Sequence, residues 1–173
     1  MRPDVQIRWA NSSDAELLAE LGARTFTETF AADNTPEDMS AYLAQSFTAA
    51  RLAEELADPK ATFLLAFVEG EAAGYAKLYR GEPPLCVTGE SAMELARLYV
   101  LQKWLGGGVG RALMQSCVDE ARRSGSRVMW LGVWEKNFRA QAFYRKWDFT
   151  TVGHQVFQLG ADTQTDLVMQ STL

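Results

Sequence analysis

The stretch Leu105-Gly106-Gly107-Gly108-Val109-Gly110-Arg111 lies between an apolar, strand-like segment and a helical pattern. Its four glycines let the backbone turn tightly, and they let the N–H groups approach a ligand without a clash at Cβ. The helix that follows presents the positive end of its dipole to the turn. Together these features predict a binding site for an anion such as a diphosphate.

Two other phosphate-binding patterns do not fit this spacing. A Walker-type loop needs Gly-Lys followed by Ser or Thr at the helix start, and this chain has Gly110-Arg111-Ala112. A dinucleotide fingerprint needs a third glycine three residues after the second, where this chain has Arg111 or Leu113. A glycine-rich turn that binds no ligand stays open as the alternative, although four glycines weaken a turn that one could make.

The segments around the turn predict a strand, a helix, a strand and a second helix. Residues 93–101 are expected to form a central strand, and apolar residues recur at helical spacing from Val109 until Gly125. Residues 128–134 form a continuous apolar run, which is typical of a strand buried on both faces. Asn137 can cap the next helix, which carries on one face Ala140, Phe143, Tyr144 and Trp147.

The outer parts of the chain complete the predicted architecture. Residues 5–9 alternate as a strand does, and residues 62–68 with 74–79 predict a hairpin. Helices are expected up to about Phe30, from the start Thr35-Pro36-Glu37-Asp38, and over residues 49–57. Last strands are expected at 152–159 and 166–169. This order predicts one α/β (α+β) domain over residues 1–173: a mixed, mostly antiparallel sheet of about seven strands with helices on both faces.

Composition narrows the class of protein. The chain has 173 residues, a formal charge of -5 and a pI near 5.0, which argues against a nucleic-acid partner. Cys86 and Cys117 have neither disulfide nor metal-ligand spacing, so no metal is expected. The sequence has no secretory segment and no apolar run long enough to span a bilayer, so we expect no membrane partner and a cytoplasmic location.

The turn resembles the pyrophosphate motif of the GNAT superfamily of acetyl-CoA-dependent N-acetyltransferases, Gln/Arg-x-x-Gly-x-Gly/Ala. Gly108-Val109-Gly110 fits its Gly-x-Gly part, whereas Leu105 stands where the family has Gln or Arg. This difference removes one side-chain contact and leaves the backbone contacts intact.

A second stretch, residues 130–146, resembles the later motif of the superfamily, a strand followed by Asn-x-x-Ala-x-x-Phe-Tyr on a helix. Asp148 replaces the glycine that usually follows this helix, and aspartate tolerates a left-handed conformation better than most residues. Residues 25–30, 94–100 and 164–166 resemble more narrowly the bacterial spermidine/spermine branch.

The resemblance implies a set of functional residues. Glu94 is the candidate base, with pairing to a nearby cation or exposure to solvent as the alternative, and Tyr144 is the candidate general acid, with a packing role as its alternative. Asn137 is expected to contact the pantetheine arm or only to cap its helix, and Arg111 and Arg139 are candidate partners of the ribose phosphate. Trp134 could border the acceptor pocket, whose loops are expected at 33–50 and 80–91. The implied cofactor contacts are Leu98, Tyr99, Val100, Leu105, Gly106, Gly107, Gly108, Val109, Gly110, Arg111, Asn137 and Arg139.

The implied function is acetyl transfer from acetyl-CoA to a primary amine, such as the polyamine spermidine, by direct attack in a ternary complex. Two alternatives stay open: an acetyl-CoA-binding regulatory module without turnover, and an acetyltransferase for a protein amine, an amino acid or an antibiotic. The expected partner is a small-molecule amine, and a homodimer is compatible with the family.

Overall fold

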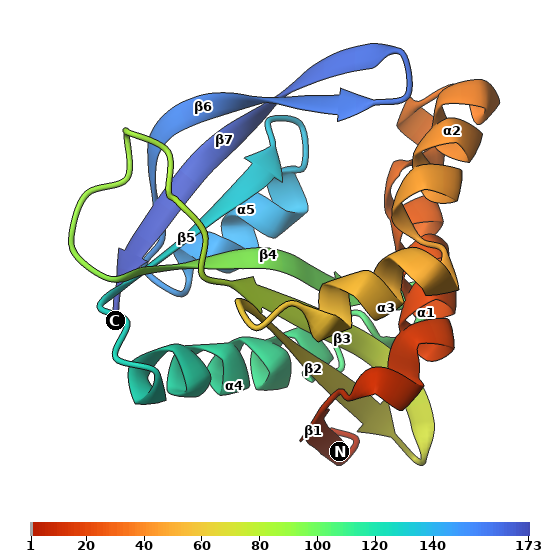
Figure 1. The fold of residues 1–173 in the computed structure, drawn as a ribbon, viewed down its shortest axis with the longest axis horizontal. Helices are drawn as coiled ribbons and strands as arrows, with labels where there is room; N and C mark the ends of the chain where they lie inside the picture. Colours follow the sequence, from red (N-terminus) through yellow and green to blue (C-terminus); the bar gives the residue numbers. More distant parts are fainter. Residues whose placement is uncertain (1) are drawn as a thin grey trace.

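The computed structural model describes residues 2–173 as a seven-stranded sheet with helices on both faces (Figure 1). The strand order is β1-β2-β3-β4-β5-β7-β6, and only the β4–β5 pair is parallel. The strands are β1 (Val5–Trp9), β2 (Ala61–Val68), β3 (Glu71–Tyr79), β4 (Ala92–Val100), β5 (Val128–Trp134), β6 (Thr150–Leu159) and β7 (Asp162–Thr172). The helices are α1 (Ala15–Phe30), α2 (Pro36–Ser46), α3 (Ala49–Ala57), α4 (Val109–Arg123) and α5 (Phe138–Arg145).

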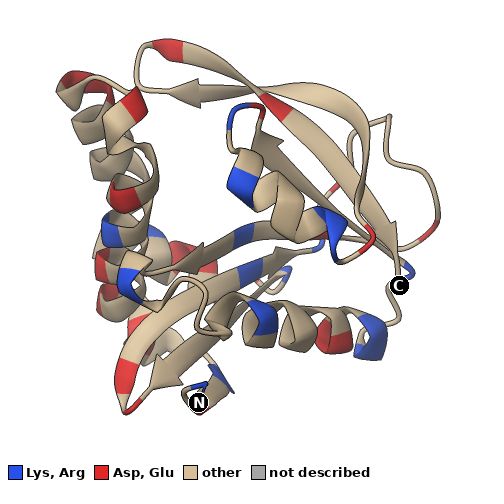
Figure 2. Cartoon of the chain, turned by 180° about the vertical axis from the view of Figure 1, so that it is seen from behind, with Lys and Arg blue, Asp and Glu red and all other residues tan. Residues whose placement is uncertain are grey.

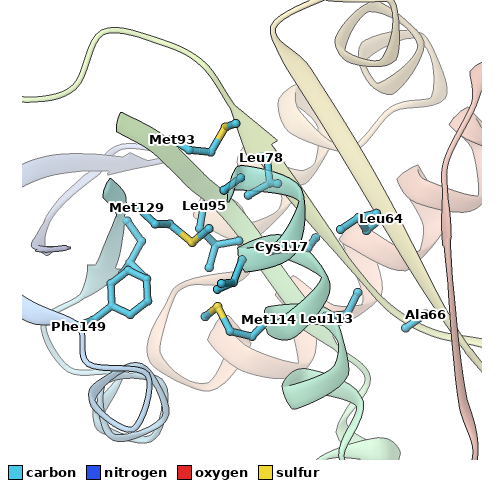
Figure 3. Packing of buried hydrophobic residues seen from close by; sticks show 14 of the residues in the cluster. Leu64, Ala66, Leu78, Met93, Leu95, Leu113, Met114, Cys117, Met129 and Phe149 are labelled. Atoms are coloured by element: carbon cyan, nitrogen blue, oxygen red, sulfur yellow. The ribbon is translucent and has the colours of Figure 1, made fainter. Parts of the chain in front are cut away.

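Each face of the sheet has its own apolar core. One core packs α4 and α5 against the sheet and includes Leu113, Cys117 and Met129, all fully buried (Figure 3). The other packs α1, α2 and α3 against the opposite face and includes Leu18, Leu52 and Leu65. The prediction of helices on both faces is therefore confirmed, and we call the two sides the α4 face and the α1 face.

The helices begin where side-chain oxygens can cap them. Thr35 accepts a hydrogen bond from the amide of Asp38, with Pro36 in the first turn, as the sequence predicts. Thr48 caps α3 in the same way. Before α1, residues 12–14 form a short 3-10 turn, which the side chain of Asn11 caps.

The parallel pair β4–β5 separates soon after it forms. Only three residue pairs join the strands, and the last of them is Glu94 with Trp130. Beyond this point β4 continues to Val100 beside β3, while β5 continues to Trp134 beside β7. The sheet therefore opens between its two central strands (Figure 1).

Several predicted boundaries need correction. β3 begins at Glu71, which pairs with Val68, so the hairpin turn is only Glu69-Gly70. β7 spans Asp162–Thr172 rather than 166–169, because its polar residues pair with β6 along the whole hairpin. The apolar run of β5 predicts a strand buried on both faces. Gly132 is exposed, so this prediction is wrong at that position.

Charged residues of both signs are spread over helices and strands (Figure 2). Within residues 2–173, no helix is long and apolar enough to cross a membrane. The same part of the chain contains no cluster of three or more His, Cys, Asp or Glu residues that could hold a metal ion.

Candidate active site

A cavity of about 1030 Å³ passes through the opening between β4 and β5. Helices α1, α4 and α5 and the β6–β7 hairpin contribute most of its other walls, and α2 and β3 add Tyr42 and Lys77. Most of the residues predicted for the site line it: Glu94, Leu98, Tyr99, Val100, Leu105, Gly106, Gly108, Gly110, Arg111, Asn137, Arg139 and Tyr144. Of the predicted set, Gly107 and Val109 do not.

The glycine-rich turn uses backbone conformations that favour glycine. Gly106 has a φ of 80° and Gly108 a φ of 96°, both in the left-handed region. A Cβ at Gly110 would meet Phe143 at 3.7 Å, an ordinary contact, so packing of the protein alone does not demand glycine at this position. Gly110 nevertheless lines the cavity, where the missing side chain leaves the backbone open to a ligand.

The backbone amides of the turn divide into two groups. Those of Leu105 and Gly107 donate to the carbonyls of Gln102 and Trp104 within the turn. In the described part of the chain, no backbone carbonyl accepts from the amides of Gly106, Gly108, Val109, Gly110 or Arg111. The last four belong to the N-terminal end of α4, where the first amides of a helix have no partner inside it. Five backbone amides of the turn are therefore free to bind a ligand, whereas the sequence predicts such a role for all seven residues, 105–111.

Helix α4 holds the turn in place by packing against the core of the α4 face. Its buried residues include Val109, Leu113 and Cys117, each with no exposed surface. Its last turn closes at Gly125, with a φ of 85°, while the amide of Ser126 donates to the carbonyl of Ala121. The side chain of Val109 points into this core, which explains why only its backbone is available to a ligand.

Residues Leu98, Tyr99 and Val100 form the β4 wall of the cavity. They pair with β3 on one side, whereas β5 has already separated from them on the other. Ala96 interrupts the β3–β4 register, because Lys77 pairs with Arg97 and Leu78 with Leu95. Backbone groups on the free edge of β4 can therefore bind an extended ligand as a neighbouring strand would.

Helix α5 forms the opposite wall. Asn137 caps it by accepting from the amide of Ala140 at 3.2 Å, and the same residue lines the cavity, so both predicted roles of Asn137 are compatible with its place. The buried Gln141 donates to the carbonyls of Trp134 and Glu135 and ties α5 to the end of β5. Asp148 ends this region with a φ of 64°, as its replacement of a glycine predicts.

Tyr144 of α5 packs against Phe143 and Phe149, and it also lines the cavity. Burial raises the pKa of its hydroxyl well above the usual value, and the nearby Cys117 adds to the rise. Tyr144 therefore holds its proton at neutral pH, as a proton donor must.

Glu94 lies at the point where β4 and β5 part, and it lines the cavity. Burial raises the pKa of its carboxyl, while the charges of Lys77 and Arg97 partly oppose that rise. These two cations instead bind Glu55, which is 8% exposed: Arg97 donates to its two oxygens at 2.7 and 2.9 Å, and Lys77 donates at 3.1 Å. Glu94 itself forms no ion pair in the described residues, so its carboxylate can accept a proton from a ligand.

The structure adds an aromatic wall that the motifs did not predict. Phe30 lies against Trp134 with ring centroids 5.9 Å apart, and Tyr42 lies against Phe157 at 5.5 Å. All four side chains line the cavity. Trp134 thus borders the cavity as the sequence suggests, and Tyr42 comes from the predicted acceptor loop 33–50, whereas the other predicted loop, 80–91, contributes no lining residue.

Asp166 is the main site residue that sequence reasoning missed. It is 8% exposed and lines the cavity from β7, opposite Trp134. Burial raises its pKa to about 6, although a hydrogen bond from its cross-strand neighbour Gln155 acts in the opposite direction. An acidic residue directly before the apolar run Leu167-Val168-Met169 is the signal that could have indicated it.

The site fits an elongated ligand that carries a diphosphate. Open amides and two left-handed glycines line the cavity at the turn, and Arg111 and Arg139 also line it. The free edge of β4 leads from the turn toward Glu94. Coenzyme A combines a diphosphate with a long amide-containing arm, so these residues match it. The chemistry available at the far end is proton transfer by a carboxyl and a phenol.

Comparisons with known proteins agree with this geometry. Residues 19–149 match the acetyltransferase (GNAT) family. An uncharacterised N-acetyltransferase of Mycobacterium bovis is 38% identical over 157 residues, which cover 91% of this chain and 96% of that protein.

Solved structures share the fold. The PaiA N-acetyltransferase of Thermoplasma acidophilum, in complex with coenzyme A, matches with a TM-score of 0.76 at 20% identity, covering 98% of this chain and 99% of that one. The ribosomal-protein-alanine N-acetyltransferase of Brucella melitensis matches with a TM-score of 0.68 at 26% identity, covering 97% and 99%. The chain therefore belongs to the GNAT family of acetyltransferases.

Proposed function

We propose that this acetyl-CoA-dependent N-acetyltransferase acetylates a primary amine, specifically a small polyamine such as spermidine, by direct attack in a ternary complex. The observation that carries the proposal is the single cavity that joins the glycine-rich turn to Glu94 through the opening between β4 and β5. Such a cavity can hold both substrates at once, as direct transfer requires.

The donor half of the cavity is assigned to acetyl-CoA. The open amides of Gly106, Gly108 and residues 109–111 bind the diphosphate, supported by the dipole of α4. The edge of residues 98–100 and the side chain of Asn137 bind the pantetheine arm, while Arg111 and Arg139 bind the ribose phosphate. When bound, acetyl-CoA supplies a thioester whose carbonyl carbon forms the new bond to nitrogen as its bond to sulfur breaks.

Glu94 takes a proton from the acceptor amine. An alkyl amine with a pKa of about 10.4 is neutral in only about one part in 2,500 at pH 7, which corresponds to about 4.6 kcal/mol. The raised pKa of Glu94 makes it a better base than an exposed glutamate, because the proton affinity of its carboxylate is closer to that of the amine.

Tyr144 provides the second proton transfer. Its phenol stays protonated at neutral pH and lines the cavity on the α5 side. Donating that proton to the departing sulfur avoids the release of a free thiolate. The nitrogen, which lost its first proton to Glu94, loses a second one to solvent as the amide forms. One of these two protons replaces the proton of Tyr144, and the other is released, so that the protonated Glu94 is again a carboxylate.

The choice of a polyamine is supported by the walls of the acceptor half. Phe30, Trp134 and Phe157 present aromatic rings, which attract ammonium groups, and Glu94 and Asp166 present carboxyls. The nearby cations Lys77 and Arg97 are bound to Glu55, which reduces their repulsion of a cationic ligand.

A protein N-terminus is the second candidate acceptor. It is favoured by the likeness to the ribosomal-protein-alanine N-acetyltransferase of Brucella melitensis. A peptide whose first residue is alanine serves to test it, because such a peptide has one reactive amine and no second ammonium nearby.

An acceptor screen that measures thiol release from acetyl-CoA tests the proposal. The panel contains spermidine, putrescine, lysine and the alanine-starting peptide, with hydrolysis in the absence of amine as the background. We expect the highest kcat/KM with spermidine. A preference for the peptide would replace the polyamine by the second candidate, and binding of acetyl-CoA without release for any acceptor would contradict the proposal.

A further inference from the structure

Asp166 is a buried carboxyl group without a cationic partner. It is 8% exposed, yet no Lys or Arg of residues 2–173 forms an ion pair with it. Its Oδ2 lies above Gly132, 3.1 Å from the position that a Cβ would occupy there, and Gly132 and Asp166 both line the cavity. Keeping such a group ionised costs free energy unless a ligand supplies the missing positive charge.

The surroundings of Asp166 suit an organic ammonium. Its cross-strand neighbour Trp134 contacts Phe30, and Phe157 lies on the adjacent strand β6. Aromatic faces attract ammonium groups and repel anions. Within the described residues, no group of three or more His, Cys, Asp or Glu side chains that could hold a metal ion includes Asp166.

Glu94 and Asp166 lie on the same face of the sheet. Glu94 pairs with Trp130, and Asp166 pairs with Trp134, so their partners on β5 are four residues apart and point to one side. Four residues at about 3.3 Å each and two strand spacings of about 4.8 Å place the two Cα atoms about 16 Å apart. The two carboxyls are therefore too far apart to act on one nitrogen, but they can bind two nitrogens of one long molecule.

We propose that Asp166 binds a second ammonium group of the acceptor while the reacting amine lies at Glu94. The acceptor is then an amine with at least two well-separated nitrogens, such as a long diamine or a triamine. Asp166 acts as a specificity-determining residue and takes no part in the proton transfers. This inference rests on the proposed function and narrows its substrate class.

Matched pairs of amines test the proposal. Thiol release is measured with 1,8-diaminooctane and octylamine, which have the same length and differ in the second nitrogen. For the wild-type protein we expect kcat/KM to favour the diamine roughly 10- to 100-fold, the range of one hydrogen bond to a charged group. In Asp166→Asn this ratio falls toward one, whereas Asp166→Glu keeps part of it. Asp119→Asn, which removes an exposed carboxylate from α4, leaves the ratio as in the wild type.

A measurement on the unaltered protein accompanies the variants. The carboxyl carbon of Asp166 is followed by NMR against pH, with coenzyme A present and with either amine added. We expect the diamine, but not octylamine, to lower the pKa of Asp166 from about 6, because a bound ammonium stabilises the carboxylate.

The outcomes separate the two proposals. Thiol release with equal rates for diamine and monoamine, together with an unchanged pKa of Asp166, would overturn the role of Asp166 while the proposed function stands. Absence of thiol release with every amine would overturn the proposed function, and the role of Asp166 with it.

Discussion

Glu94 and Tyr144 reach the same cavity from different elements, and both owe their proton affinities to burial. The carboxyl of Glu94 and the phenol of Tyr144 have raised pKa values. For Glu94 the rise makes the carboxylate a stronger base, and for Tyr144 it keeps the hydroxyl protonated. Burial therefore makes Glu94 a stronger base, whereas it keeps the phenol of Tyr144 protonated and makes it a weaker acid.

Glu94→Gln keeps the size of the side chain and removes the base. We expect kcat/KM at pH 7 to fall about 100-fold, the usual contribution of a general base. In the wild type, activity rises with pH as the carboxyl of Glu94 ionises, at a pH above the ordinary glutamate pKa because burial raises it. A pH–rate profile of both proteins checks this, since the variant should lack that rising limb. Glu90→Gln, in an exposed loop, is the control. If Glu94→Gln has the same pH–rate profile as the wild type, Glu94 takes no part in the chemistry.

Tyr144→Phe deletes one hydroxyl and keeps the ring contacts with Phe143 and Phe149. We expect kcat to fall about 100-fold, with little change in the free energy of unfolding. Steady-state kinetics and urea denaturation together check the prediction. Tyr79→Phe provides the matched control, since Tyr79 does not line the cavity. Wild-type turnover in Tyr144→Phe would mean that Tyr144 serves only in packing.

Helix α3 contributes to the site through one buried charge. Glu55 of α3 binds Arg97 of β4 and Lys77 of β3, and it thereby ties the helix to the two strands beside the cavity. Burial alone would raise the pKa of Glu55, but hydrogen bonds and the charges of Arg97 and Lys77 outweigh it and lower the pKa. The stability that this pairing provides is present above the ordinary glutamate pKa and is lost as the pH falls through the lowered value.

Glu55→Gln leaves two cations near the cavity without their carboxylate. We expect the free energy of unfolding to fall by about 2–4 kcal/mol at pH 7, and the difference from the wild type to shrink in acid. Urea denaturation at pH 7 and at pH 4 measures both effects. Glu54→Gln changes the neighbouring residue, whose side chain is 74% exposed, and is expected to alter stability by no more than about 0.5 kcal/mol. Equal effects of the two substitutions would show that the buried pairing does not stabilise the fold.

A substitution in the first turn of helix α4 is expected to change the stability of the fold and the binding of acetyl-CoA in opposite directions. Gly110 lies in its first turn, where alanine finds room beside Phe143 and Val100. We expect Gly110→Ala to raise the free energy of unfolding by about 0.5–1 kcal/mol, since alanine favours a helix over glycine. The same methyl group lies where the diphosphate approaches, so KM for acetyl-CoA should rise about tenfold or more. Ser116→Ala, on the same helix, is the control and is expected to leave KM for acetyl-CoA unchanged. If Gly110→Ala also leaves this KM unchanged, the diphosphate does not bind at the turn.

The elements and the site differ in how far they could be predicted. The predicted bounds of β1, α3 and β5 equal the observed ones, because a capping residue or a change of pattern marks each end of these elements in the sequence. The bounds of β7 were missed, since its polar residues Gln164 and Thr165 resemble a loop until β6 pairs with them. The proposed catalytic pair, Glu94 and Tyr144, and the turn follow from motifs. Asp166 and the aromatic wall depend instead on strands and helices that only the tertiary fold brings together.

One cavity contains both the proposed diphosphate site and the proposed proton-transfer site, and the glycine-rich turn is the part on which the account depends. Backbone amide NMR with coenzyme A and with pantetheine, which lacks the diphosphate, tests it most directly. We predict that coenzyme A shifts the amide signals of Gly106, Gly108 and Gly110 in a saturable way and that pantetheine does not. The signals of Gly70 and Gly125, which have positive φ angles but lie outside the cavity, should stay in place with both ligands. Unmoved signals from the turn at saturating coenzyme A, or equal shifts with pantetheine, would contradict the account.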